Sequence, residues 1–238
     1  MARVYVVEDN ELIRGAVQEY LEVSGYEVAS FATIADTREA FAQRKPDVII
    51  LDVMLPDGSG FVFAKEIRRE GNTPIIFLTA KEQESDRIMG FEVGGDDYVV
   101  KPFSNKELLL RIEALLKRVS SPKQEDKTIS CTYTLNSGES RLEIDEKAHK
   151  VFLDGEELHL TSTEWSLLTY LAGRVDQAIS RSALLGECLG YLYSGSERTV
   201  DTHIANLRAH LGEGEWIETI RGFGYRFAGV PLSGDLEE

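Results

Sequence analysis

Four apolar stretches of this sequence are each followed directly by side chains that can do chemistry. Glu8 and Asp9 follow the first, Asp52 follows another, and Thr79 and Lys101 follow the last two. Three carboxylates close together repel one another, so they need a cation among them. Oxygen ligands without nitrogen or sulfur favour Mg²⁺ or Mn²⁺. The sequence therefore predicts a divalent-metal site with a hydroxyl and an ammonium group beside it.

The apolar stretches themselves predict the strands of a parallel sheet. They are short, rich in β-branched residues and free of polar alternation, as strands buried on both faces are. Segments with helical spacing separate them, so strand and helix alternate as in a doubly wound α/β domain. The carboxyl ends of such strands meet at one crevice, which would bring the reactive side chains together. The predicted strands are Val4–Val7, Glu27–Phe31, Val48–Leu51, Ile75–Leu78 and Tyr98–Val100.

The pattern changes after Arg118, where the first predicted domain (residues 1–118) ends. Residues 119–128 are polar, contain a proline and lack apolar periodicity, which predicts a linker. Residues 129–230 predict a small antiparallel sheet, three helices and a closing hairpin, and residues 231–238 a tail. A capping box of Thr161 with Glu164 begins the first of these helices. The third helix, from about 197 to 211, has an apolar stripe of Val200, Ile204, Leu207 and Leu211.

Composition and charge exclude several classes of protein. The apolar stretches are too short to span a bilayer, and acids interrupt the N-terminal stretch where a signal peptide would stay apolar. We therefore expect a cytoplasmic protein. The chain has 26 basic and 41 acidic residues, which argues against a nonspecific nucleic-acid binder but not against a local basic face. Its two cysteines, Cys131 and Cys188, predict neither a disulfide framework nor a metal cluster.

Residues 2–118 resemble the receiver domains of two-component response regulators. The segments that carry the resemblance are Val6–Asn10, Leu51–Gly60, Phe77–Ala80 and Gly94–Phe103. It implies a flavodoxin-like five-stranded sheet, and that Asp52 accepts a phosphoryl group from a sensor histidine kinase. Phosphoryl transfer needs an in-line nucleophile and neutralised phosphoryl oxygens. Lys101 would offer a positive charge to those oxygens and Thr79 a hydrogen bond. The resemblance also implies that Lys101-Pro102 is a cis peptide.

The resemblance also implies a metal, a switch and a dimer. Mg²⁺ would be held by Glu8, Asp9, Asp52 and the backbone carbonyl of Met54. Phosphorylation would draw Thr79 inward and let Tyr98 rotate, which biases a two-state equilibrium. In regulators of the OmpR/PhoB type the matching charges pair across a two-fold dimer. The pairs carried over to this chain are Arg87 with Glu107, Asp97 with Arg111, and Asp96 with Arg118.

Residues from about 129 onward resemble the winged-helix DNA-binding domain of the same OmpR/PhoB-type family. The segments concerned are Leu160–Leu168, Arg198–Arg208 and Ile220–Phe227. The resemblance implies that the third helix enters the major groove of promoter DNA and that the wing reaches the minor groove. Arginines there can bind phosphates, and an asparagine can read adenine. The candidate DNA-binding residues are Arg198, Thr199, Thr202, His203, Asn206, Arg208 and Arg221; a contact with RNA polymerase is a further expectation.

The sequence departs from that pattern in its charges. Ala205 and Ala209 stand where relatives usually carry basic residues, and the part of the chain after residue 118 has 11 basic against 20 acidic residues. Two alternatives therefore stay open. The winged helix could bind a protein partner instead of DNA. The chain could also be a Mg²⁺-dependent phosphatase, although such enzymes usually place a second acid where Met54 stands, so we do not expect an enzyme.

Overall fold

The computed structural model of this chain describes residues 1–79, 95–120, 130–135, 140–189, 197–212 and 215–232. The chain divides into two compact units, Met1–Val119 and Ser120–Glu238. Within the described residues, no helix combines the length and apolar character needed to cross a membrane.

A parallel five-stranded sheet forms the centre of the first unit, as the apolar stretches predict. The strands lie in the order β2-β1-β3-β6-β7, so the chain starts in the interior of the sheet and winds to both sides. Every residue of β3 and β6 is buried, which explains why these strands show no polar alternation. The five strands are β1 (Arg3–Val7), β2 (Glu27–Phe31), β3 (Val48–Asp52), β6 (Ile75–Thr79) and β7 (Asp97–Val100).

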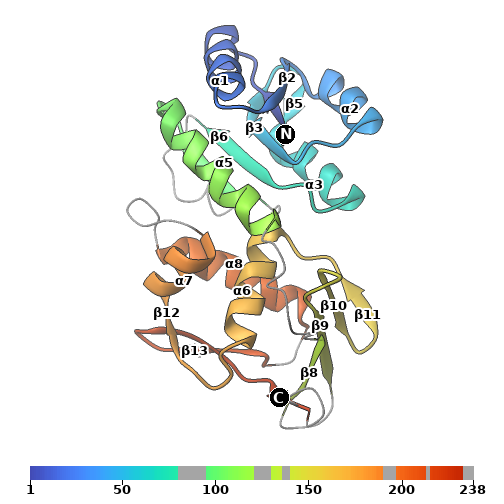
Figure 1. Cartoon of the computed structure of the whole chain (residues 1–238), viewed down its shortest axis with the longest axis vertical. Helices are drawn as coiled ribbons and strands as arrows, with labels where there is room; N and C mark the ends of the chain where they lie inside the picture. The colour runs from blue at the N-terminus through green and yellow to red at the C-terminus, as the bar shows by residue number, and fades with distance from the viewer. Residues whose placement is uncertain (80–94, 121–129, 136–139, 190–196, 213–214, 233–238) are drawn as a thin grey trace. The chain divides into compact units, whose positions relative to one another are not determined.

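Helices cover both faces of this sheet (Figure 1). Helices α1 (Glu11–Val23) and α5 (Asn105–Ser120) pack on one face, and α2 (Ile34–Gln43) and α3 (Gly60–Glu70) on the other. Successive side chains of a strand point to opposite faces, so each central strand feeds both cores. On the α1 side the core includes Val6, Ile50 and Leu78; on the α2 side it includes Val7, Leu51 and Phe77. Each such buried side chain stabilises the fold by about 1.5–3 kcal/mol.

The loop after β3 is held in place by backbone contacts. It forms a short hairpin of β4 (Met54–Leu55) and β5 (Gly58–Ser59) before α3 begins. The Asp57 carboxylate accepts hydrogen bonds from the backbone N–H groups of Ile34 and Ala35, which ties the loop to the first turn of α2. A Cβ atom on Gly60 would lie 2.1 Å from the backbone oxygen of Asp52, so only glycine fits there. The end of β3 is therefore fixed by its own loop.

The second unit begins with an antiparallel sheet in the order β11-β10-β9-β8-β15. The sequence predicts the central hairpins, but β8 and β15 were not predicted. Their pairing is between distant segments, with Val230 opposite Thr134, and it draws Pro231 out of the predicted tail. The strands are β8 (Ser130–Thr134), β9 (Arg141–Asp145), β10 (Lys150–Leu153), β11 (Glu156–Leu158) and β15 (Val230–Pro231).

Three helices and a second sheet complete this unit. The predicted capping box of Thr161 and Glu164 begins α6 (Ser162–Ala172), which is followed by α7 (Arg181–Leu189) and α8 (Glu197–His210). The predicted closing hairpin joins β13 (Ile217–Ile220) to β14 (Gly224–Phe227), and β12 (Ile179–Ser180) pairs with β14.

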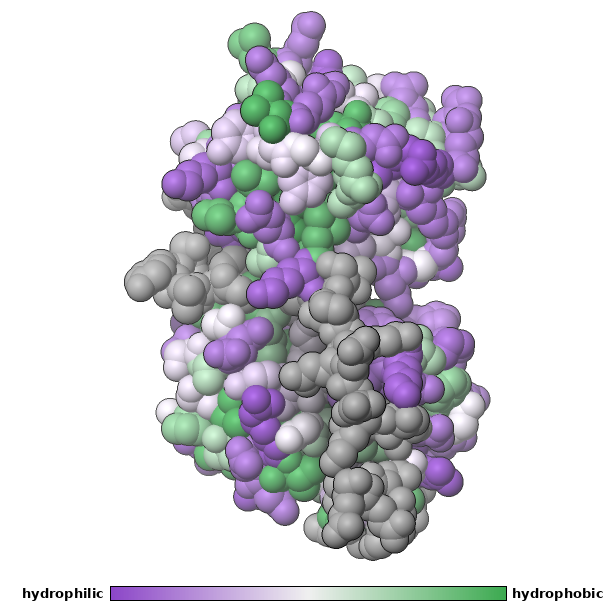
Figure 2. Space-filling view, in the orientation of Figure 1, coloured by the Kyte–Doolittle hydropathy of each residue, from purple (hydrophilic) through white to green (hydrophobic). Residues whose placement is uncertain are grey.

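A single apolar core lies under these helices and strands. It includes Trp165 of α6, Leu184 of α7 and Ile204 of α8. Hydrophilic side chains cover most of the face of the molecule in Figure 2, with hydrophobic ones in small separate groups. The larger apolar side chains of the described residues are thus mainly inside, as expected of a folded globular chain.

Candidate functional site

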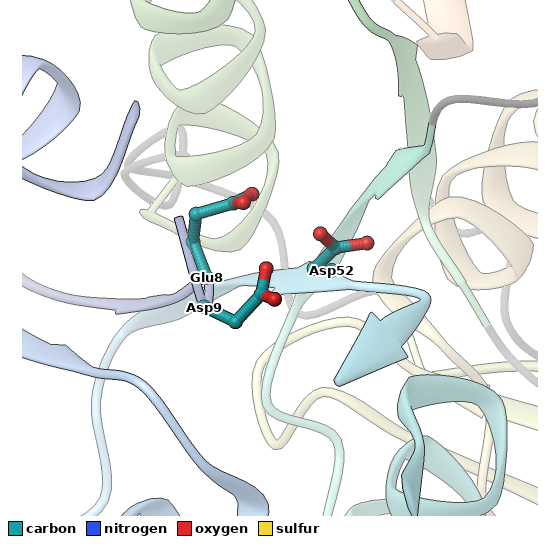
Figure 3. A group of neighbouring side chains, drawn as sticks. All are labelled: Glu8, Asp9 and Asp52. Carbon is teal, nitrogen blue, oxygen red and sulfur yellow. The ribbon is translucent and has the colours of Figure 1, made fainter. Parts of the chain in front are cut away.

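The reactive side chains predicted from the strand ends do converge. Lys101 Nζ lies 2.6 Å from Asp52 Oδ2 and 2.5 Å from Glu8 Oε2, so one ammonium bridges two strand ends. Carboxylate oxygens of Glu8, Asp9 and Asp52 all lie within 4.8 Å of one another. Figure 3 shows the three side chains at the ends of neighbouring strands β1 and β3. The parallel topology accounts for this, because it puts all carboxyl ends of the strands at one edge.

The charge balance of this pocket fits a divalent cation. Glu8 is fully buried and Asp52 is 5% exposed, whereas Asp9 is exposed to solvent. One lysine offsets only one of the three carboxylates, so the pocket keeps an excess of negative charge at its open side. A cluster of carboxylate oxygens with one solvent-facing member is a donor set suited to Mg²⁺, which retains water ligands. The residues present therefore fit this ion.

Burial and ion pairing perturb the protonation of the pocket. Burial raises the pKa of the Glu8 carboxyl, although its hydrogen bond to Lys101 opposes the shift. Burial alone would lower the pKa of Lys101, but hydrogen bonds and charge attraction from Asp52 and Glu8 outweigh it and raise that pKa. Lys101 therefore stays a cation at neutral pH, which is the state needed to offset the carboxylates.

Thr79, Tyr98 and Met54 lie around this centre. Thr79 is the last residue of β6, is 3% exposed, and accepts a backbone hydrogen bond from Lys101 N–H at 2.6 Å. Tyr98 is 5% exposed and its ring centroid lies 6.2 Å from that of Phe77. The backbone N–H of Met54 donates to Asp52 Oδ1 at 3.0 Å, while its side chain is exposed. The expected cis peptide between Lys101 and Pro102 is present.

Arg14 also belongs to this site, and the sequence analysis missed it. It lies on α1 and its Nη1 donates to the backbone oxygens of Glu8, at 2.7 Å, and Asp9, at 3.0 Å. Asn10 caps the same helix through hydrogen bonds from Leu12 and Ile13. The acidic turn is thus fastened to the start of α1. An arginine five residues after the acidic pair was the only signal in the sequence, and such a residue is usually a solvated helix charge.

Helix α8 presents a mixed face to solvent in the second unit. Val200, Ile204 and Leu207 are fully buried, as the apolar stripe predicts. Arg198 and Ala205 are exposed, and Thr202 and Asn206 are partly so. In the turn between β13 and β14, Arg221 is exposed. The helix and the turn therefore offer cations and one amide to a ligand.

Three of the residues expected on this face lie elsewhere. Thr199 and His203 are 5% and 1% exposed, so the prediction that they border the outward face is wrong. Helix α8 packs against both α6 and α7, which widens its buried side beyond the apolar stripe. Arg208 is partly buried and its Nη2 donates to the backbone oxygen of Ile217 at 2.7 Å and to Thr219 at 2.8 Å. Its guanidinium is therefore bound to the wing rather than directed outward.

Comparisons with known proteins agree with this geometry. The family model described as "Response regulator receiver domain" matches residues 4–113, and the model "Transcriptional regulatory protein, C terminal" matches residues 155–227. The transcriptional regulatory protein SrrA of Staphylococcus aureus is 38% identical over 229 residues, which covers 94% of each chain. The chain belongs to the two-component response regulators of the OmpR/PhoB type.

Solved structures match nearly the whole chain as well. A mutant of RitR matches with a TM-score of 0.75 and 25% identity, covering 95% of this chain and 99% of the other. DrrB of Thermotoga maritima, described as an OmpR/PhoB homolog, matches with a TM-score of 0.51 and 33% identity, covering 96% and 100%. This response regulator thus combines a receiver domain with a winged-helix domain that binds DNA and regulates transcription.

Among the described residues, four of the charges expected at a dimer interface of this regulator pair within one chain. Asp97 pairs with Arg111 at 3.2 Å, and Arg111 also binds Glu107 at 2.7 Å. Asp96 is 1% exposed and pairs with Arg68 at 2.7 Å. The reason is proximity, since β7, α3 and α5 belong to one unit. Arg87 and the side chain of Arg118 lie outside the described residues.

Proposed function

We propose that Asp52 accepts a phosphoryl group from a sensor histidine kinase. An oxygen of the Asp52 carboxylate attacks phosphorus, the bond from phosphorus to the donor atom breaks, and the donor leaves with the electron pair. The observation that carries the proposal is the Lys101 ammonium, 2.6 Å from Asp52 at the meeting point of the strand ends. There it can neutralise a phosphoryl oxygen, while the hydroxyl of Thr79 donates a hydrogen bond to another.

Glu8, Asp9, Asp52 and the backbone carbonyl of Met54 would hold Mg²⁺ in this pocket. When bound, the ion supplies positive charge to the phosphoryl oxygens. The carboxylate cluster within 4.8 Å supports this assignment. The hydrogen bonds that Arg14 makes to the backbone of Glu8 and Asp9 keep both ligands oriented.

We further propose that phosphorylation favours a homodimer. Thr79 and Tyr98 lie on the neighbouring strands β6 and β7, so a shift of one can be transmitted to the other. On α5, Leu110 is 56% exposed between Glu107 and Arg111, a mixture of apolar and charged groups that suits an interface. Any cross-subunit pairing of Asp97 with Arg111 would require exchange of the pair that exists within the chain.

The dimer is expected to read promoter DNA with Arg198, Thr202, Asn206 and Arg221, which are exposed or partly exposed. Thr199, His203 and Arg208 are not proposed as direct contacts. We propose that the protein acts in the cytoplasm, because its DNA target lies in that compartment. A contact with RNA polymerase stays a prediction.

The test is labelling with radioactive acetyl phosphate and Mg²⁺. The wild-type chain should take up one phosphoryl group and then sediment as a dimer, whereas Asp52→Asn should stay unlabelled and monomeric. Asp36→Asn, which removes an exposed carboxylate on α2, is the matched control and should label like wild type. Equal labelling of Asp52→Asn would refute the assignment. A fully labelled protein that remains monomeric would refute the dimer alone.

A further inference from the structure

Tyr225, on strand β14 of the wing, lies beneath two arginines that come from two different helices. Arg181, the first residue of α7, has its guanidinium carbon 4.9 Å from the centre of the Tyr225 ring. The guanidinium carbon of Arg208, on α8, lies 5.5 Å from the same centre. A cation above an aromatic ring is attracted by the ring electrons, more strongly where water is excluded. Tyr225 is only 4% exposed, so its ring joins both helices to the wing.

The hydroxyl of Tyr225 adds a second connection. It donates to Asp201 Oδ1 of α8 at 2.6 Å, and Arg181 Nε donates to the same oxygen at 2.6 Å. Burial and the hydrogen bond to Asp201 both raise the pKa of Tyr225, so the hydroxyl keeps its proton and remains a donor. Charge-assisted hydrogen bonds of this kind are stronger than neutral ones.

Further contacts fix the helix and the wing along their length. Asp201 and Arg208 are about two turns apart on α8, and Arg208 binds the backbone oxygen of Ile217 in β13. The backbone N–H of Arg181 donates to the oxygen of Phe223 in the wing turn at 3.2 Å. The start of α7, two positions on α8 and both strands of the wing are therefore connected.

The negative charge of Asp201 on this helix needs an explanation. An acid on a helix that approaches DNA phosphates opposes binding, because affinity depends on neutralising those phosphates. The Asp201 side chain is 41% exposed, so it is not needed to fill the core. Asp201 instead contributes its contacts with Arg181 and Tyr225.

We propose that Asp201, Arg181 and Tyr225 are positioning residues that set the angle between α8 and the wing. With that angle fixed, Asn206 and Arg221 can reach the major and minor grooves of one site at the same time. Site residues must be held closely by supporting contacts for recognition to be selective. The inference deepens the proposed DNA reading and rests on it.

The experiment compares two variants that each remove one negative charge from the winged-helix domain. Asp201→Asn removes the negative charge that binds Arg181 and Tyr225, while the hydrogen bond from Arg208 to Ile217 remains. Glu218→Gln is the matched control, because Glu218 binds Arg226 on the neighbouring strand of the same hairpin. Fluorescence anisotropy measures binding of the full-length chain to a duplex selected by the wild type from random sequence, and to an unrelated duplex.

For Asp201→Asn we expect the ratio of specific to nonspecific affinity to fall by roughly tenfold, a loss comparable to that of one base-pair readout. For Glu218→Gln the ratio should stay within about twofold of wild type, because readout is intact and charge affects both duplexes alike. Equal ratios for the two variants would overturn the positioning role. A wild-type chain that selects no sequence would instead refute the DNA reading itself.

Tyr225→Phe provides a second measurement should Asp201→Asn fail to fold by circular dichroism. It keeps the ring under both arginines and removes the hydroxyl, which donates to Asp201 and accepts from Arg181 Nη2 at 3.4 Å. We expect the affinity ratio to fall while the slope of log affinity against log salt stays at the wild-type value. A slope shallower by about 0.9 would mean a lost phosphate contact and would overturn the proposal.

Discussion

The phosphoryl pocket and the DNA-reading face of this regulator are positioned in different ways. In the pocket, Glu8 and Lys101 directly follow strands of one parallel sheet and Asp52 ends another, and backbone pairing of the strands brings them together. On the reading face, α8 and the wing turn are separate elements. Side chains such as Asp201 and Arg208 determine how these elements meet.

This difference explains which expectations were met. Residues at the ends of paired strands have their neighbours determined by topology, so their convergence follows from the order of strands and helices. Whether a side chain on a helix faces solvent or the core depends on how many elements pack around that helix. His203 was expected at the margin of the reading face, yet it is buried because both α6 and α7 pack against α8.

The largest effect should come from Gly60→Ala, which tests the backbone positioning of the pocket. The new Cβ would lie 2.1 Å from the backbone oxygen of Asp52, so the loop or the end of β3 must move. We expect the receiver domain to lose about 3 kcal/mol of stability, together with phosphoryl uptake. Chemical denaturation followed by circular dichroism measures the first, and acetyl phosphate labelling the second.

Gly15→Ala is the control for this change, since nothing lies within 4 Å of a Cβ at that position in the middle of α1. It should leave labelling unchanged and stabilise the helix by up to about 1 kcal/mol. If Gly60→Ala were as stable as Gly15→Ala, the close approach at the end of β3 would not constrain the pocket.

An intermediate effect is expected for Asn206→Ala, which tests direct readout by α8. An asparagine that pairs with adenine contributes about 1–3 kcal/mol of discrimination at one base pair. The variant should therefore lose preference at a single position of the selected site, as measured by competition with singly substituted duplexes. Arg221→Ala should weaken binding to all of these duplexes, with a salt slope shallower by about 0.9. Loss of preference at many positions in Asn206→Ala would indicate a moved helix.

The smallest effect should be that of Asp57→Asn, which loosens the loop after β3 from α2. Hydrogen bonds from Ile34 and Ala35 lower the pKa of Asp57, so its stabilisation is present above the unfolded-state pKa of about 3.9 and is lost as pH falls through the folded-state value. The variant should lose about 1 kcal/mol at pH 7 and little at lower pH. Thermal unfolding across pH measures this difference.

Glu39→Gln makes the same change of charge at an exposed site on α2. Its stability should follow that of the wild type at every pH. If both variants showed the same loss at pH 7, net charge rather than the hydrogen bonds of Asp57 would be responsible.

The sequence by itself determined the α/β class, the five parallel strands and the pocket residues from Glu8 to Lys101. Those features depend on local apolar runs and on the residues that directly follow them. Each run can be recognised from a single segment of the chain. It also determined the apolar stripe of α8, because helical periodicity is local.

The tertiary structure alone decided which partners several polar side chains and one strand edge contact. It paired β8 with β15, directed Arg14 to the acidic turn, and placed Arg68 on Asp96. It also bound Arg208 to the wing. Each of these contacts involves a long polar side chain or a strand edge that could have faced solvent. Packing of the elements against one another selected one partner, and no local pattern of residues encodes that choice.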